Sequence, residues 1–255
     1  MKTVLLAGGL GTRLREETEF LPKPMVPIGG KPILWHIMKN YSHRGINEFI
    51  VCAGYKGEVI KEYFHNFLIK NLDFTVHIGA NPKIISHGEV PEEWKVTVVD
   101  TGQTTFTGGR LFKIRDHIDS ETFMCTYGDG LSNVNIQDLL DFHFSHGKIA
   151  TLTAVRPPSR FGVVNLDNDG LVDSFQEKPQ MDSWINGGYF VFNKKIFDYL
   201  DENIVLEEQP LRRLATENQL MAFRHQGFWQ PMDTFREMTL LNELWGSNDA
   251  PWKVW

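Results

Sequence analysis

Glycines and two cationic side chains follow the first apolar run of the chain, in an order suited to binding phosphate. Three glycines within Gly8–Gly11 come directly after Leu5–Ala7, and Arg13 and Lys23 stand behind them. Glycine lets the backbone approach a ligand closely, and successive backbone N–H groups form a concavity for phosphate oxygens. The Arg13 fork and the Lys23 ammonium both suit a polyphosphate. This stretch therefore predicts an anion site.

The two best-known phosphate loops do not fit this stretch. A Walker A loop needs Lys and then Ser or Thr after its second glycine, whereas Gly11 is followed by Thr12 and Arg13. The dinucleotide fingerprint needs Gly or Ala where Leu14 stands. The alternative is a glycine-rich turn with two surface cations, but the order of strand, glycines and cations favours the anion site.

Two aspartates are candidates for chemistry near this site. Asp129 lies between Gly128 and Gly130, directly after the apolar run 123–127. Ligands of open α/β sheets bind at such strand ends, and a carboxylate beside phosphates commonly holds Mg²⁺. A turn stabilised by Asp129 itself is the alternative. Asp233 precedes the helix expected over 234–245, and a role as its N-cap is open.

A third group of polar residues stands in the second half of the chain. Glu177 and Lys178 follow a predicted strand, and Asn186 and Gly187 open another. Lys178 is suited to a sugar phosphate, Glu177 and Asn186 to hydroxyl groups, and Gly187 to the close approach of a sugar ring. Solvated surface side chains are an equally good interpretation from these residues alone.

Composition narrows the class of protein. The 255 residues are 42% hydrophobic and 23% charged, which is typical of a globular chain with one or two domains. The net charge of -6 argues against a general nucleic-acid surface. Cys52 and Cys125 lie in apolar runs and are expected to be buried free thiols. The first apolar run is too short for a signal peptide, and none has the length of a membrane span, so we expect a cytoplasmic protein without a membrane partner.

Strands and helices are expected to alternate through the first half. The predicted strands are 2–7, 49–53, 74–78, 96–99, 123–127 and 150–155, and the predicted helices begin at Pro32, Gly57, Thr107 and Ile136. Such alternation predicts a three-layer α/β fold with a mixed, mostly parallel sheet of the Rossmann-like kind. The segment Asn81–Glu93 is expected to be irregular.

The second half alternates less regularly. Strands are expected over 161–166, 171–176, 185–192 and 220–225, with short helices near 194–200 and 211–217. Because no Ser/Gly linker divides the chain, we expect a single domain over 1–255. Within it, we expect 1–156 to form the nucleotide-binding half, around the anion site, and 157–255 to form a smaller, β-rich half that binds the acceptor, a sugar phosphate.

The glycine-rich motif followed by Pro22-Lys23-Pro24 resembles the signature of the sugar-1-phosphate nucleotidylyltransferases. The resemblance covers nearly the whole chain and is greatest to the cytidylyltransferases of that family. The motifs that carry it are Lys31–Met38, Gly54–Gly57, Val99–Gly102, Thr107–Leu111, Tyr127–Gly130, Phe175–Pro179, Asn186–Gly188 and Phe228–Thr234.

This resemblance implies Mg²⁺-dependent transfer of a cytidylyl group from CTP to glucose 1-phosphate, giving CDP-glucose and pyrophosphate. It implies a nucleotide site formed by Leu6, Ala7, Gly8, Gly9, Leu10, Gly11, Thr12, Arg13, Lys23, Thr105, Arg110 and Gly128. Asp129 and Asp233 would hold the metal, and Arg13, Lys23 and Asp129 would be catalytic. Glu177, Lys178, Asn186 and Gly187 would face the sugar phosphate. Relatives form homo-oligomers and serve polysaccharide synthesis, including that of O-antigen.

Two alternatives stay open at this point. The same transfer with another NTP or sugar 1-phosphate is one, because Leu131–Asn135 and Val163–Asn165 depart from the family pattern near the acceptor side. The other is a catalytically silent nucleotide sensor, against which the joint presence of Arg13, Lys23 and the two aspartates argues.

Overall fold

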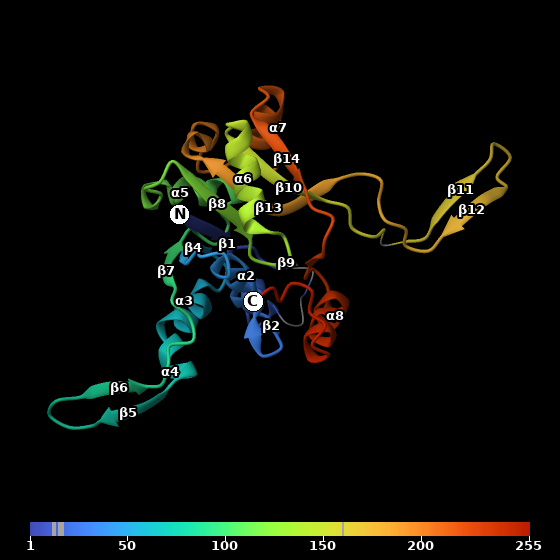
Figure 1. Ribbon diagram of the computed structural model, residues 1–255. Coiled ribbons are helices and arrows are strands. Elements are labelled where there is room, and N and C mark those ends of the chain that lie inside the picture. Colours follow the sequence, from blue (N-terminus) through green and yellow to red (C-terminus); the bar gives the residue numbers. More distant parts are fainter. Residues whose placement is uncertain (12–13, 15–17, 160) are drawn as a thin grey trace.

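A seven-stranded mixed sheet forms the centre of the structure, a computed structural model that describes residues 1–11, 14, 18–159 and 161–255 (Figure 1). Six strands run parallel, and β13 is antiparallel to its neighbours β8 and β10. In spatial order the strands are β14 (Leu220–Arg224), β10 (Ala150–Val155), β13 (Ile185–Asn193), β8 (Thr122–Tyr127), β1 (Lys2–Leu6), β4 (Glu48–Ala53) and β7 (Lys95–Asp100). The predicted mostly parallel sheet is confirmed.

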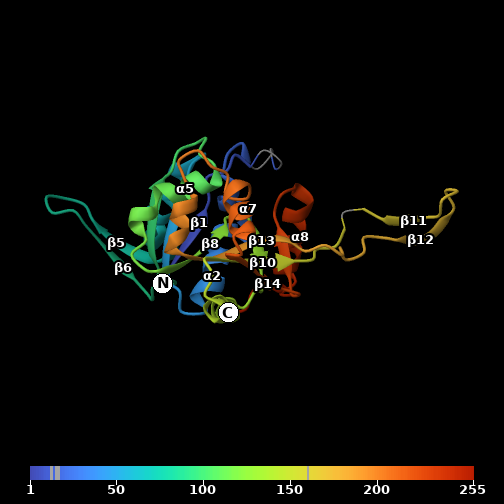
Figure 2. The same ribbon diagram turned by 90° about the horizontal axis from the view of Figure 1, so that it is seen from above.

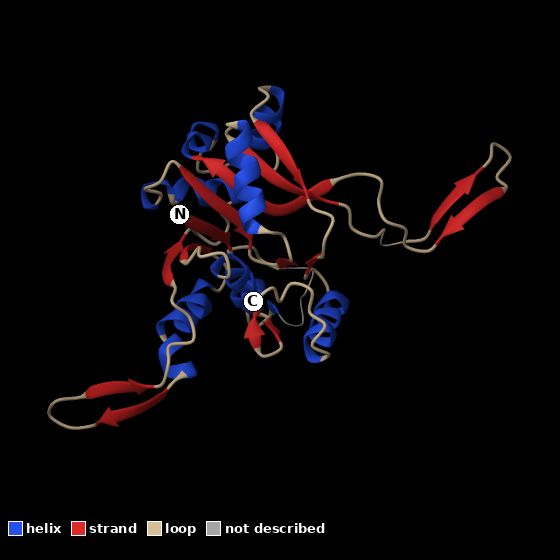
Figure 3. Ribbon diagram, in the orientation of Figure 1, coloured by secondary structure: helices blue, strands red, loops and turns tan. Residues whose placement is uncertain are grey.

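Helices cover both faces of this sheet (Figure 3). One face packs against α2 (Ile33–Ser42), α3 (Gly57–His65) and α6 (Ile136–His146), and α8 (Phe235–Gly246) joins this core beyond the sheet, next to β2. The other packs against α5 (Thr107–Lys113), the 3-10 helix η3 (Lys194–Tyr199) and α7 (Gln209–Thr216). In β1, Leu5 belongs to the first core while Val4 and Leu6 belong to the second. Burial on both faces explains the continuous apolar runs of the sequence.

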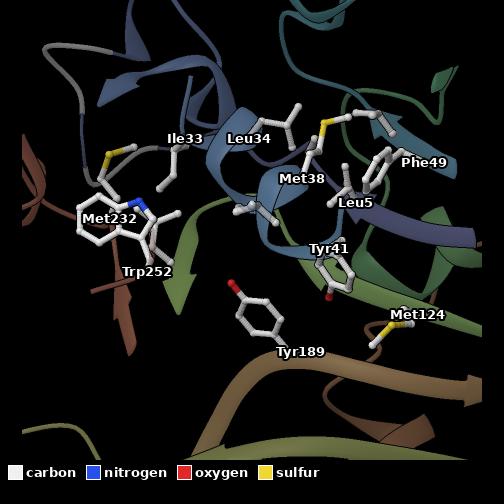
Figure 4. Packing of buried hydrophobic residues seen from close by; sticks show 14 of the residues in the cluster. Leu5, Ile33, Leu34, Met38, Tyr41, Phe49, Met124, Tyr189, Met232 and Trp252 are labelled. Carbon is white, nitrogen blue, oxygen red and sulfur yellow. The ribbon is translucent and has the colours of Figure 1, made fainter. Parts of the chain in front are cut away.

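The larger core continues to the end of the chain. Tyr41 of α2 stacks on Tyr189 of β13, with ring centroids 6.1 Å apart (Figure 4). Trp252 is fully buried in the same core, where its indole N–H donates to His36 Nδ1 at 3.3 Å. His36 Nε2 bonds the Ile28 carbonyl at 2.9 Å. Burial lowers the pKa of His36 to about 4, so the imidazole stays neutral at pH 7.

Two hairpins project from opposite sides of this body (Figures 1 and 2). One consists of β5 (Asp73–His77) and β6 (Lys83–His87), the other of β11 (Val163–Leu166) and β12 (Val172–Gln176). The expectation that 74–78 is a strand of the main sheet is wrong, because among the described strands β5 pairs with β6 alone, and β7 takes that place beside β4. The expectation of an irregular 81–93 is also wrong over β6. Every residue of β5 is exposed, so its apolar side chains do not mark a buried strand.

Shorter elements complete the described chain. They are η1 (Lys23–Met25), β2 (Pro27–Ile28), β3 (Lys31–Pro32), α4 (Phe67–Asn71), η2 (Arg115–His117), β9 (Gly130–Ser132) and β15 (Trp229–Pro231). The predicted burial of Cys52 and Cys125 as free thiols is confirmed. The described helices include none with the length and apolar character that crossing a membrane requires.

Candidate active site

A cavity of about 520 Å³ opens at the carboxyl ends of β1 and β8. This volume is in the range of small-molecule sites, and the position is where open α/β sheets bind ligands. Its lining brings together segments that are far apart in the sequence. They are Leu6, Ala7, Gly8, Gly9, Gly11, Lys23, Pro24, Thr105, Phe106, Thr107, Arg110, Tyr127, Gly128, Asp129, Val205, Glu207 and Asp233.

Arg110 holds the glycine-rich loop in place through hydrogen bonds. Its guanidinium donates to the carbonyl oxygens of Gly8 and Gly102 at 2.9 and 2.8 Å and to the Thr101 hydroxyl at 2.7 Å. A Cβ at Gly8 would collide with this guanidinium, so a larger residue there would displace Arg110. Arg110 is only 3% exposed, and burial lowers its pKa. Its hydrogen bonds to protein groups make Arg110 a support of the glycine-rich loop, and its contact with a nucleotide stays a prediction.

Lys23 joins the two aspartates that the sequence singled out. Its Nζ donates to Asp129 Oδ2 at 2.7 Å and to Asp233 Oδ1 at 2.5 Å. Burial alone would lower the pKa of Lys23, but the two carboxylates outweigh it and raise the pKa above its usual value. Lys23 is therefore a fixed positive charge between two negative ones.

A short antiparallel pair positions the two aspartates. β9 begins directly after Asp129 and pairs with β15, in the register Pro231 with Gly130. The backbone N–H of Met232 then donates to the Asp129 carbonyl at 2.8 Å. The N-cap of α8 is Thr234, which forms a capping box with Glu237. The alternative that Asp233 caps this helix is therefore wrong.

The chemistry of this pair fits a magnesium ion. Both carboxylates reach the same Lys23 nitrogen, so they lie close together beside the glycine-rich loop. Mg²⁺ commonly takes one or two protein carboxylates and completes its octahedron with phosphates and water. Among the described residues no set of three His, Cys, Asp or Glu side chains is arranged to hold a metal. Asp129 and Asp233 suit an ion that is shared with a nucleotide.

A carboxylate that the sequence did not point to stands on the cavity wall. Glu207 lies between β13 and α7 and accepts hydrogen bonds from Tyr127 and Thr107, both at 2.5 Å. The sequence carries no signal for it, since Glu207 belongs to neither a motif nor an apolar pattern. Thr107 and Tyr127 themselves stood inside motifs that resemble the family, but without a role.

Other predicted site residues lie outside the described residues or outside the cavity lining. Thr12 and Arg13 lie outside the described residues, and Leu10 is 49% exposed and absent from the cavity lining. Glu177 and Lys178 pair at 3.5 Å at the base of the projecting β11–β12 hairpin, away from that lining.

Asn186 and Gly187 lie near the start of β13. The Asn186 amide donates to the Tyr127 hydroxyl at 3.0 Å, and Trp229 donates to the Gly187 carbonyl at 2.7 Å. Neither residue is part of the cavity lining. Asn186 is linked to the cavity lining through its hydrogen bond to Tyr127.

Residues 2–230 match the family described as nucleotidyl transferase, and the chain belongs to this family. It is a nucleotidyltransferase. Over the full length of both chains it is 54% identical to glucose-1-phosphate cytidylyltransferase of Salmonella typhimurium and 45% identical to the probable glucose-1-phosphate cytidylyltransferase of Bacillus subtilis. The crystal structure of HddC from Yersinia pseudotuberculosis, 25% identical, superposes with a TM-score of 0.69 and covers 96% of this chain and 99% of that one.

Proposed function

We propose that this nucleotidyltransferase transfers the cytidylyl group of CTP to glucose 1-phosphate, releasing pyrophosphate and forming CDP-glucose. The observation that carries the proposal is the similarity over full length to two relatives with that named activity. The cavity supports it, because a glycine-rich loop, a buried lysine and two carboxylates meet there.

The reaction needs alignment and charge neutralisation more than proton transfer. The attacking group is a phosphate oxygen of the sugar phosphate, which is already ionised at neutral pH. It attacks the α-phosphorus of CTP, and the bond to the pyrophosphate leaving group breaks. Lys23 lines the cavity, and its ammonium would stabilise the negative charge that develops on this phosphate. Arg13 has the same proposed role.

Asp129 and Asp233 would hold the Mg²⁺ ion. When bound, this ion neutralises phosphate charge and keeps the phosphates in line for displacement. The backbone of the glycine-rich loop, together with Thr105 and Gly128, would surround the nucleotide. Glu177, Lys178, Asn186 and Gly187 remain our assignment for the sugar phosphate, on the strength of the family resemblance.

A substrate panel tests this proposal. Each of CTP, UTP, GTP and ATP is paired with glucose, mannose and galactose 1-phosphates, and pyrophosphate release is measured with Mg²⁺ present. CTP with glucose 1-phosphate is expected to give the highest kcat/KM and a product with the mass of CDP-glucose. A different best pair would show the same chemistry on other substrates. Binding of nucleotide without turnover of any pair would identify a sensor instead.

We also propose that the protein is cytoplasmic and assembles into a homo-oligomer, and the exposed apolar side chains at the β11–β12 hairpin support the assembly. Four large apolar side chains in this hairpin or directly before it are at least 60% exposed: Phe161, Leu166, Leu171 and Phe175. Apolar patches of this kind commonly mark protein interfaces. Leu166→Asp and Leu171→Asp together are expected to lower the mass found by analytical ultracentrifugation. Phe144→Asp, which changes an exposed aromatic side chain of α6, is the matched control.

A further inference from the structure

Glu207 is held in one orientation at the wall of the cavity. Tyr127 donates its hydroxyl hydrogen to Oε1, and Thr107 donates its own to Oε2. Each carboxylate oxygen has two lone pairs, so one hydroxyl uses only part of its capacity to accept hydrogen bonds. Glu207 lines the cavity together with both donors. It therefore offers an oriented carboxylate with acceptor capacity to spare.

The hydrogen bonds behind Glu207 all run in one direction. Asn186 donates to the Tyr127 hydroxyl at 3.0 Å, and the Leu206 backbone N–H donates to the Thr107 hydroxyl at 3.0 Å. Each hydroxyl thus receives one bond and donates its only hydrogen to Glu207. Burial, followed by the charge of Glu207, raises the pKa of Tyr127 well above its usual value, so this donor stays protonated. Such a chain fixes Glu207 as an acceptor.

The ligand group that faces Glu207 must bring hydrogen-bond donors. Phosphate oxygens are excluded, because a carboxylate and a phosphate repel one another in a partly dry cavity. The substrates of a sugar-nucleotide synthesis carry hydroxyl groups on two rings, the ribose of the nucleotide and the hexose of the acceptor. A carboxylate that accepts from a ribose hydroxyl is also the solution of many dinucleotide-binding proteins.

We infer that Glu207 binds substrate hydroxyl groups, accepting hydrogen bonds from one sugar ring in the cavity, with Asn186, Tyr127 and Thr107 as the residues that position it. This inference rests on the proposed function, which supplies the two candidate rings. It also gives Asn186 a place in sugar recognition although its side chain is not part of the cavity lining.

The test pairs a variant of Glu207 with substrates that lack single hydroxyl groups. Native enzyme and Glu207→Gln are assayed with CTP and its 2′-deoxy and 3′-deoxy forms, and with glucose 1-phosphate and its 2-, 3-, 4- and 6-deoxy forms. Glu208→Gln is the matched control, since this neighbouring carboxylate is exposed and is not part of the cavity lining. Thermal unfolding of each variant shows whether it folds.

Loss of one hydrogen bond to a charged group should lower kcat/KM of Glu207→Gln by roughly 10- to 100-fold with the complete substrates. With the deoxy substrate that lacks the bound hydroxyl, native enzyme and variant should agree within about threefold, because the interaction is missing from both. Convergence on a deoxy-CTP identifies the ribose, and convergence on a deoxyglucose phosphate identifies the hexose. Glu208→Gln should keep the native ratio throughout.

Three results would overturn the inference. One is a Glu207→Gln penalty that stays the same with every deoxy substrate, which is the behaviour of a purely structural residue. Another is a penalty that disappears only when UTP replaces CTP, which would place the base against Glu207. The third needs no variant: native enzyme that loses less than threefold with each deoxy substrate has no such hydroxyl contact.

Failure of the proposed function would look different. If CTP and glucose 1-phosphate give no product, calorimetric titration of native enzyme and Glu207→Gln with CTP, 2′-deoxy-CTP and glucose 1-phosphate still tests the hydroxyl contact.

Discussion

Lys23 and Arg110 are two buried cations in the same cavity that use positive charge in opposite ways. Lys23 faces two carboxylates, which raise its pKa. Arg110 faces backbone carbonyls and the Thr101 hydroxyl, and burial lowers its pKa. Arg110 connects the backbone segments whose carbonyl groups it binds. Lys23, which binds two carboxylates, can instead contact a bound phosphate when the carboxylates bind a cation. Under the proposed function, Lys23 belongs to the part of the cavity that does the chemistry and Arg110 to the part that shapes it.

Removal of the proposed Mg²⁺ ion should have the largest effect on turnover. We expect EDTA to abolish turnover and Mg²⁺ to restore it. Asp129→Asn and Asp233→Asn should each strongly reduce Mg²⁺-dependent turnover. The double variant should cost far less than the sum of the two losses in activation free energy, because the residues act as one unit. Additive losses, or unchanged Mg²⁺ dependence in Asp233→Asn, would show that the two carboxylates do not hold one metal ion together.

Lys23→Met should come next in size. One lost electrostatic stabiliser of the transition state lowers kcat by roughly 10²–10³. Circular dichroism and the melting temperature with Mg²⁺ present should stay close to native. Normal turnover of this variant would remove Lys23 from the chemistry and leave it as a structural ion pair.

Arg110→Met should lower the stability of the fold, in contrast to Lys23→Met, which lowers kcat. It removes the guanidinium hydrogen bonds to the carbonyls of Gly8 and Gly102 and to the Thr101 hydroxyl, and the loss of these bonds should lower the free energy of unfolding by about 3 kcal/mol. For a chain of this size that corresponds to a melting temperature lower by about 6–12 °C. Arg115→Met, which changes an exposed arginine, is the control. Loss of kcat at an unchanged melting temperature would make Arg110 part of the chemistry.

His36 provides the smallest effect, and one that lies outside the cavity. Its pKa is about 4 in the folded chain and about 6.5 when unfolded, so only the unfolded chain takes up a proton between these values. Stability should therefore fall as the pH drops through this window, by about 2 kcal/mol between pH 7 and pH 5. Urea unfolding of native protein and His36→Gln measures it. An equal pH slope in both would contradict the assignment.

Much of the fold was predictable because burial on both sheet faces leaves continuous apolar runs. The runs at β1, β4 and β8 are of this kind, and the structure has them as neighbouring strands. Phe74–Ile78 is an apolar run of the same kind, but it lies in an exposed hairpin. Local sequence cannot separate the two, since pairing partners are set by the folded chain.

The same limit applies to the site. Lys23, Asp129 and Asp233 stood out through their motifs, and the structure brings them together. Glu207 did not, because its hydroxyl partners are 100 and 80 residues away in the chain. The two hydroxyl groups come next to Glu207 only when the chain folds.

A competition between nucleotides tests the proposed function most directly. Equal concentrations of CTP and UTP are incubated with enzyme, Mg²⁺ and glucose 1-phosphate, and the two sugar nucleotides are separated and quantified. Cytosine and uracil differ in one exocyclic group, and a site that hydrogen-bonds such a group can discriminate strongly. We predict that CDP-glucose is formed in large excess, since the product ratio reports the ratio of kcat/KM. Equal amounts of CDP-glucose and UDP-glucose would contradict a cytidylyltransferase.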